Sequence, residues 1–133
     1  MTRLFIVILL VALLVGLASL EQHVIQSAYH KLENDTNTLV ATIRTQSEAM
    51  QDIDTPENIA KINEMYEWWL RQERRLSMLA RHFDLSQVSI NLIYAKNFIY
   101  FNNDEEAMVG LMQVQYLVKT HSFNIGTSIQ NVI

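Results

Sequence analysis

Four histidines are the side chains of this sequence best suited to binding a metal ion or titrating near neutral pH. They are His23, His30, His82 and His121. No two stand four residues apart, the spacing that places two ligands on adjacent turns of one helix. His23 and His30 are seven residues apart and would share a helix face, which alone is not a ligand pattern. We expect structural roles for them, with no metal and no cofactor, and keep pH sensing as the alternative.

Catalytic patterns are also missing from the sequence. It contains no nucleophile elbow, phosphate-binding loop, zinc-protease motif or dinucleotide fingerprint. The carboxylates are spread along the chain and do not meet by spacing, although folding could bring some of them together. We therefore expect a protein that is not an enzyme.

Basic residues concentrate in one stretch. This stretch holds Arg71, Arg74, Arg75, Arg81 and His82. Spacings of three and four place most of them on one helix face, which could bind an acidic partner or lipid headgroups. The acids within helical reach are Glu64, Glu67 and Glu73. A solvated face paired with these acids is the simpler interpretation.

Trp68 and Trp69 precede the arginines directly. Adjacent residues on a helix point about 100° apart, so one tryptophan can enter a core while the other needs a second surface. That surface could be an arginine side chain or a partner protein. Alternatively, both rings could pack inside one core. We select Trp68, Arg71, Arg74 and Arg75 as candidate partner-binding residues.

Composition narrows the class of protein. The chain has 133 residues and a net charge of −4, which disfavours binding to nucleic acid. One proline and three glycines favour long helices. With no cysteine, neither a disulfide framework nor thiol chemistry is available.

An uncharged apolar run extends from Leu4 to Leu20, near the lower length limit of a membrane-spanning helix. Arg3 precedes it and Glu21 follows it, which favours a cytoplasmic N-terminus, a bundle outside the cell membrane and a single pass. Small residues at Gly16 and Ala18 would also suit a cleaved signal peptide. Because the helical pattern runs straight on, we expect a retained anchor over residues 1–21 and a helical domain over 22–133.

A heptad stripe continues from the apolar run and predicts one helix to about Gln51. The stripe comprises Ile25, Tyr29, Leu32, Thr36, Leu39, Ile43, Gln46, Met50 and Ile53. Further helices are predicted over about 56–82, 85–101 and 104–121, followed by an extended tail over 122–133. The expected caps are Thr55 before Pro56, Asp84 with Gln87, and Asn103 with Glu106.

The third predicted helix is strongly apolar, and we expect it to be central to the bundle. Its expected buried line is Val88, Leu92, Ala95 and Ile99, broadened by Ile93, Tyr94, Phe98, Tyr100 and Phe101. The predicted fold is all-α, with an N-terminal transmembrane helix continuing into an antiparallel bundle of about four helices.

The second half of the chain resembles a family of short bacterial membrane-anchored proteins, domain of unknown function 4363. The residues that carry this resemblance are Trp68, Trp69, Leu79, His82, Asp84, Ser86, Leu92, Asn97, Phe98, Asn103, Asp104, Ala107, Leu111, Val118 and His121. The closing run Ser-Ile-Gln-Asn-Val-Ile at 128–133 is similar to that family's Ser-Leu-x-Asn-Ile-Phe, with Ile133 where phenylalanine is usual. The adjacent tryptophans are a second departure.

This resemblance covers essentially the whole chain and implies no catalytic residue or cofactor. It implies an accessory subunit of a multi-pass membrane protein, with the sporulating cell or the spore membrane as its setting. We therefore expect a non-enzymatic, membrane-tethered interaction module. The alternatives are a ligand or signal sensor with a pocket near Trp69, Tyr94 and His121, and a homo-oligomer assembled through the stripe over 25–53.

Overall fold

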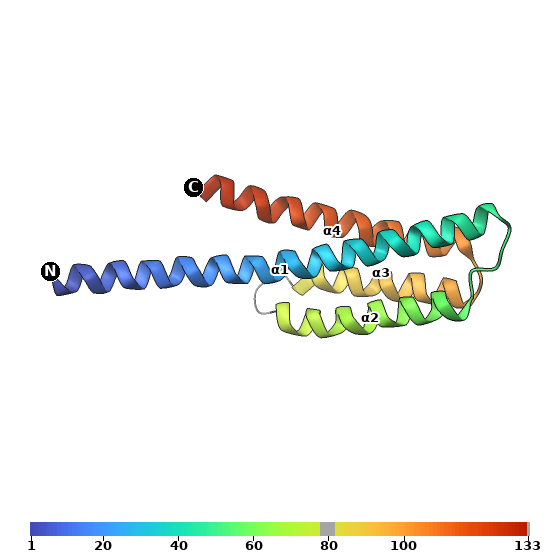
Figure 1. Cartoon of the computed structure of the whole chain (residues 1–133), viewed down its shortest axis with the longest axis horizontal. Coiled ribbons are helices and arrows are strands. Elements are labelled where there is room, and N and C mark those ends of the chain that lie inside the picture. Colours follow the sequence, from blue (N-terminus) through green and yellow to red (C-terminus); the bar gives the residue numbers. More distant parts are fainter. Residues whose placement is uncertain (78–81, 133) are drawn as a thin grey trace.

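A computed structural model describes residues 1–77 and 82–132, without the side chains of 82–84 and 121–132. The described chain forms four helices and no strand. They are α1 (Thr2–Glu48), α2 (Pro56–Leu76), α3 (His82–Tyr100) and α4 (Asp104–Val132), shown in Figure 1. The predicted all-α fold is confirmed.

The four helices run alternately up and down and pack side by side (Figure 1). α1 contacts α2 and α4, and α3 contacts the same two helices, so α1 and α3 occupy opposite corners of the bundle. The N-terminal part of α1 projects past the end at which α2 finishes and α3 starts, and the C-terminal part of α4 also extends past this end, apart from α1 (Figure 1). We call this end of the bundle the exit end.

Burial along α1 changes sharply where the helix enters the bundle. Residues 1–21 are all exposed, whereas Ile25 is the first of a regular series of buried residues. The stripe prediction is confirmed from Ile25 to Ile43. Thr36, the polar member of this buried series, is satisfied within its own helix because its hydroxyl donates to the Leu32 carbonyl at 2.7 Å.

The far end of α1 departs from the prediction. The helix ends at Glu48, and Met50 is 96% exposed although the stripe predicts its burial. Met50 has a φ of 55°, and the amides of Met50 and Gln51 bond back to the carbonyls of Ser47 and Gln46. This hydrogen-bonding pattern is a Schellman cap, which turns the chain out of the helix one turn before Ile53. Ile53 is still buried, but from the connecting loop.

α2 begins as predicted and ends earlier. The Thr55 hydroxyl accepts a hydrogen bond from the Asn58 amide at 3.2 Å, and Pro56 takes the first helical position. The helix finishes at Leu76 and not near His82. Residues 78–81 and the side chains of Phe83 and Asp84 lie outside the described part of the chain.

Glu73 interrupts the apolar side of α2 because it binds α3. Its carboxylate accepts hydrogen bonds from the hydroxyls of Ser86 at 3.1 Å and Ser89 at 2.6 Å. A carboxylate in this partly buried position needs such donors to offset the loss of water. The polar break in the sequence pattern is therefore part of the α2–α3 interface.

α3 contains the predicted buried line, and Leu85 joins it in the core, but most of the residues expected to broaden the line are not core. Val88, Leu92, Ala95 and Ile99 are fully buried, while Phe98 is half-buried. Four side chains expected to broaden that line are exposed, namely Ile93, Tyr94, Tyr100 and Phe101. A helix at a bundle corner buries only the side that faces its neighbours. α3 also begins at His82, so Asp84 lies two residues inside the helix, and its side chain lies outside the described part.

α4 continues through the segment that we predicted to be an extended tail. Asn103 caps its start as expected, accepting from the Glu106 amide at 3.1 Å, and the buried line from Ala107 to Val118 is confirmed. The helix runs to Val132 because residues 122–132 contain no proline and a single glycine. The side chains of His121, Ile125, Ile129 and Val132, and the whole of Ile133, lie outside the described part.

Asn102 joins the two loops at the end opposite the exit end. Its side-chain oxygen accepts from the Ile53 amide at 2.8 Å, and its side-chain nitrogen donates to Asp52 at 2.9 Å. Its φ of 54° is a left-handed conformation that asparagine tolerates. Ser47 additionally donates to Asp104 in the first turn of α4. These polar contacts close the bundle where side-chain packing ends.

Candidate membrane segment and interaction surfaces

The projecting part of α1 is long and apolar enough to cross a membrane. Its most apolar stretch has no residue buried against the rest of the protein. A helix of this composition cannot be explained as a core element of the bundle, since it contacts no other helix there (Figure 1).

The predicted arginine face lies at the exit end, on the last two turns of α2. Arg71, Arg74 and Arg75 are all exposed. Among the described residues, none of the three lies within 4 Å of a carboxylate. Glu73, one of the acids expected to pair with them, is held by Ser86 and Ser89 instead. Within the described chain these guanidinium groups therefore remain available for another partner.

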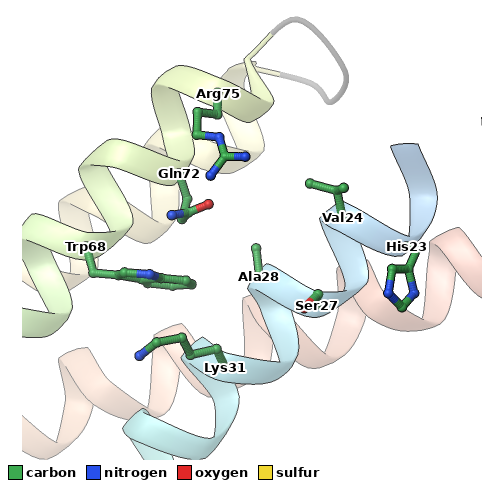
Figure 2. A pocket seen from close by; sticks show the side chains of 8 residues that line it. All are labelled: His23, Val24, Ser27, Ala28, Lys31, Trp68, Gln72 and Arg75. Carbon is green, nitrogen blue, oxygen red and sulfur yellow. The ribbon is translucent and has the colours of Figure 1, made fainter. Parts of the chain in front are cut away.

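An open groove of about 250 Å³ lies between α1 and α2 at this end (Figure 2). We call it the α1/α2 groove. It is lined by His23, Val24, Ser27, Ala28, Lys31, Trp68, Gln72 and Arg75. Two of the four predicted partner-binding residues, Trp68 and Arg75, therefore meet in one hollow, whereas Arg71 and Arg74 lie on the exposed surface beside it.

The two tryptophans occupy different environments, as their adjacency allows. Trp69 is fully buried, donates to the Leu85 carbonyl at 3.3 Å and packs 5.8 Å from the Tyr29 ring. Trp68 is half-buried, and its ring centre lies 4.7 Å from the Lys31 ammonium. Trp69 thus supplies core area, while Trp68 forms a wall of the groove (Figure 2).

Lys31 is also held by a carboxylate. Its ammonium lies 2.8 Å from Asp35, which Lys61 of α2 approaches to 3.2 Å. Partial burial raises the pKa of Asp35, but the hydrogen bonds and charges of the two lysines outweigh burial and hold that pKa below its ordinary value. This charge cluster fixes Lys31 across the α1–α2 boundary beside Trp68.

A second surface feature is the outward side of α3. Its exposed large apolar residues are Ile90, Ile93, Tyr94 and Tyr100, and exposed Phe101 follows directly after the helix ends. Spacings of four and seven place Ile90, Tyr94 and Phe101 along one side of the helix direction, and we call these three the α3 row. Tyr94 donates to Glu106 of α4, and this hydrogen bond, with some desolvation and the nearby negative charge, raises the pKa of Tyr94.

The histidines do not assemble into a site in the described part of the chain. His23 and His30 are exposed on α1, while the side chains of His82 and His121 lie outside what is described. Within the described residues, no group of three potential ligands could hold a metal ion. Of the residues expected to form a pocket, Trp69 and Tyr94 do not line the α1/α2 groove, and the side chain of His121 lies outside the described part.

The family model of the domain of unknown function DUF4363 matches residues 26–132. The chain belongs to this family. No curated protein and no solved structure matches it. The DUF4363 match begins one residue after Ile25, where α1 becomes buried, so the family domain coincides with the bundle and excludes the projecting helix.

The α3 row lies inside the DUF4363 domain, and our sequence analysis missed it as a surface. Apolar residues surround α3 on all sides, which we interpreted as a central position in the bundle. The same signal fits a corner helix with an exposed apolar side, and in a four-helix bundle every helix is a corner helix. Recognising this geometry would have marked the α3 row as a candidate surface.

Proposed function

We propose that this protein is a membrane-tethered interaction module without catalytic activity, acting as an accessory subunit of a multi-pass membrane protein. The membrane attachment is supported by the projecting apolar part of α1. With Arg3 before the apolar run and Glu21 after it, the N-terminus lies in the cytoplasm and the bundle outside the cell membrane. The sporulating cell or spore membrane as the setting rests on the family resemblance alone.

The α3 row is the observation that carries the interaction proposal. Phe101 is 79% exposed and Ile90 is 55% exposed, although the bundle has a well-filled core elsewhere. Exposing large apolar side chains to water is unfavourable, so a group of them on a surface commonly marks a protein–protein contact. A partner with its own apolar surface would cover the row and bury the Tyr94 ring.

The second contact surface is formed by Trp68, Arg71, Arg74 and Arg75. Its charge suits an acidic group, and its place at the exit end puts it close to the membrane from which α1 emerges. The α3 row and this arginine surface lie on different helices of the bundle. A subunit could therefore contact its partner through α3 while α2 faces the membrane surface.

Affinity capture of the full-length protein from native membranes, followed by mass spectrometry, tests this function. We expect one reproducible multi-pass membrane protein, lost in the double variant Ile90→Gln with Phe101→Gln. The matched control is Thr38→Gln with Thr42→Gln, two exposed positions on α1. Capture that is unaffected by the α3 variant, or no captured membrane protein, would contradict the proposal.

A sensor is the second candidate, because α1 is one unbroken helix from the projecting segment to Glu48. A shift inside the bundle could then be transmitted along α1. Replacing Glu21 and Gln22 by proline removes hydrogen bonds at the junction while leaving the buried series from Ile25 intact. If that variant keeps full function, α1 is a simple tether and the sensor hypothesis is contradicted.

Self-assembly through the 25–53 stripe has less support. The stripe from Ile25 to Ile43 is covered by the chain's own helices, and Met50 alone among its apolar members is fully exposed. A homo-oligomer would need another surface, such as the α3 row. Size determination in detergent, with and without the Ile90→Gln and Phe101→Gln changes, distinguishes this arrangement from a heteromeric one.

A further inference from the structure

The α1/α2 groove opens at the level where the chain would leave a membrane. This placement rests on the membrane attachment proposed above. Val24, at the exit end of the groove, is four residues beyond Leu20, which is about 6 Å along a helix axis. The headgroup layer on each side of a bilayer is roughly 5–7 Å thick. The exit end of the groove therefore lies in or beside the lipid headgroups.

The antiparallel course of α2 brings Arg75 to this same level. Arg75 lies in the last turn of α2 and lines the groove opposite Val24 (Figure 2). Among the described residues it pairs with no carboxylate. A guanidinium so placed can reach a phosphate directly and hold it with two hydrogen bonds.

The rest of the groove is also suited to an anion. Lys31 contributes a second cation at the inner end, although Asp35 balances part of its charge. None of the groove's described lining residues is acidic. The net charge of the lining is therefore positive, and it complements a phosphate group.

Polar and apolar side chains divide the groove in a way that fits a lipid headgroup. The Gln72 amide and the Ser27 hydroxyl can bond to a headgroup hydroxyl, while Ala28 leaves space between them (Figure 2). Trp68 closes the inner end of the groove and limits its depth. A volume of about 250 Å³ is below the usual range for drug-sized ligands, so a small headgroup fits better than a peptide segment.

We propose that the α1/α2 groove binds the headgroup of an anionic glycerophospholipid from the leaflet that α1 leaves. The phosphate lies beside Arg75, the headgroup hydroxyls extend toward Ser27 and Gln72, and the acyl chains run along the apolar part of α1. A bound lipid links α1 to α2 at the exit end. It thereby sets the orientation of the bundle, and hence of the α3 row, relative to the membrane.

Native mass spectrometry of the full-length protein in detergent tests this site, with phosphatidylglycerol, phosphatidylcholine and soluble glycerol 3-phosphate as probes. We expect phosphatidylglycerol to bind at least about tenfold more tightly than phosphatidylcholine. Both lipids carry a phosphate, but the choline group adds a positive charge beside Arg75 and Lys31 and has no hydroxyl for Ser27 and Gln72. Arg75→Gln should remove about tenfold of that affinity. Arg44→Gln is the control, because it removes the same charge from an exposed position of α1 that lies outside both the groove and the arginine surface.

A second variant tests the groove without changing its charge. Ser27→Leu fills the space with an apolar side chain at an exposed position of α1 and should also weaken phosphatidylglycerol binding. Thermal unfolding of each variant confirms that the bundle is intact. Equal losses of affinity in Arg75→Gln and Arg44→Gln, or equal binding of the two lipids, would overturn the proposal.

Two further results would also overturn it. Binding of glycerol 3-phosphate as tight as that of the lipid would assign the groove to a soluble phosphate compound. Unchanged lipid binding in Arg75→Gln, together with loss of an acidic protein from affinity capture, would assign the arginines to that protein. Alkaline extraction of membranes tests membrane insertion separately from lipid binding. Release of the protein would show that it is not inserted, which would contradict the proposed function itself.

Discussion

The ammonium group of Lys31 lies 4.7 Å from the centre of the Trp68 ring and joins α1 to α2 near the exit end. The same ammonium lies 2.8 Å from Asp35, so one side chain contacts an aromatic face and a carboxylate at once. Since α1 also forms the projecting helix, this contact ties the bundle to the segment that we propose to be in the membrane.

A double-mutant cycle measures that contact. Lys31→Met and Trp68→Leu keep most of the apolar volume and remove the charge or the ring, so they isolate the attraction between the two. We expect a coupling of about 0.5–1 kcal/mol in the free energy of unfolding, the usual value at partly exposed sites. The longer contact of Lys96 with Tyr66, at 5.4 Å, should give a smaller coupling. Strictly additive effects at Lys31 and Trp68 would contradict the interaction.

The carboxylate of Asp35 should make the free energy of unfolding depend on pH in the acid range. Its pKa is lowered from the ordinary value of 3.8, because the two lysines outweigh the opposite effect of burial. A carboxyl whose pKa is lower in the folded state stabilises the fold above its unfolded pKa, and this contribution disappears as pH falls through the folded value. Asp35→Asn should therefore be less stable than wild type at neutral pH.

That difference should shrink as the pH falls from about 4 toward the folded pKa of Asp35. Thermal unfolding at a series of pH values follows it. Glu64→Gln, an exposed carboxylate on α2, is the control and should show a smaller effect. A stability difference for Asp35→Asn that stays constant into strong acid would contradict the lysine–carboxylate assignment.

Gly110 marks a close crossing of α3 and α4. A Cβ atom added there would lie 3.0 Å from the backbone nitrogen of Ala95 and 3.0 Å from the Tyr94 ring. Gly110→Ala should destabilise the bundle by about 1 kcal/mol or more, because overpacking of about 1–3 kcal/mol exceeds the gain in helix propensity. Gly16→Ala is the control, with nothing within 4 Å of the added atom. A more stable Gly110→Ala variant would show that the crossing is loose.

At Met50, in contrast to Gly110, we expect a substitution to stabilise the bundle. The left-handed backbone of Met50, with a φ of 55°, is strained for a residue with a Cβ atom, and its side chain is 96% exposed. Met50→Gly should raise the free energy of unfolding by up to about 1 kcal/mol, since glycine suits this cap position. Asn102→Gly at the matching position after α3 should instead destabilise, because it removes the hydrogen bonds to Ile53 and Asp52. A less stable Met50→Gly variant would refute the strain argument.

Local patterns predicted much of this fold. The heptad spacing from Ile25 to Ile43 gave the buried side of α1, and the polar residues Thr55 and Asn103 marked the starts of α2 and α4. These features depend on residues within one or two turns of each other, so spacing alone identifies them. The end of α1 was missed because the Schellman cap at Met50 uses methionine where glycine is the usual signal.

Features that depend on neighbouring helices were harder to predict. Leu92 and Ile93 are adjacent and equally apolar, yet one is fully buried and the other exposed, because only α3's inner side meets α2 and α4. The arginine surface was predicted, but the α1/α2 groove was not. Ser27 and Lys31 meet Trp68 only through the packing of two helices, which spacing within either helix does not reveal.

The most direct test of the central claim is site-specific photo-crosslinking of the full-length protein in native membranes. A photoreactive side chain at position 90, in the α3 row, should give one crosslinked product with a multi-pass membrane protein. The same side chain at position 42, on the exposed face of α1, should give none. A protein that yields no product from position 90, or the same products from both positions, would contradict an interaction module that binds its partner through α3.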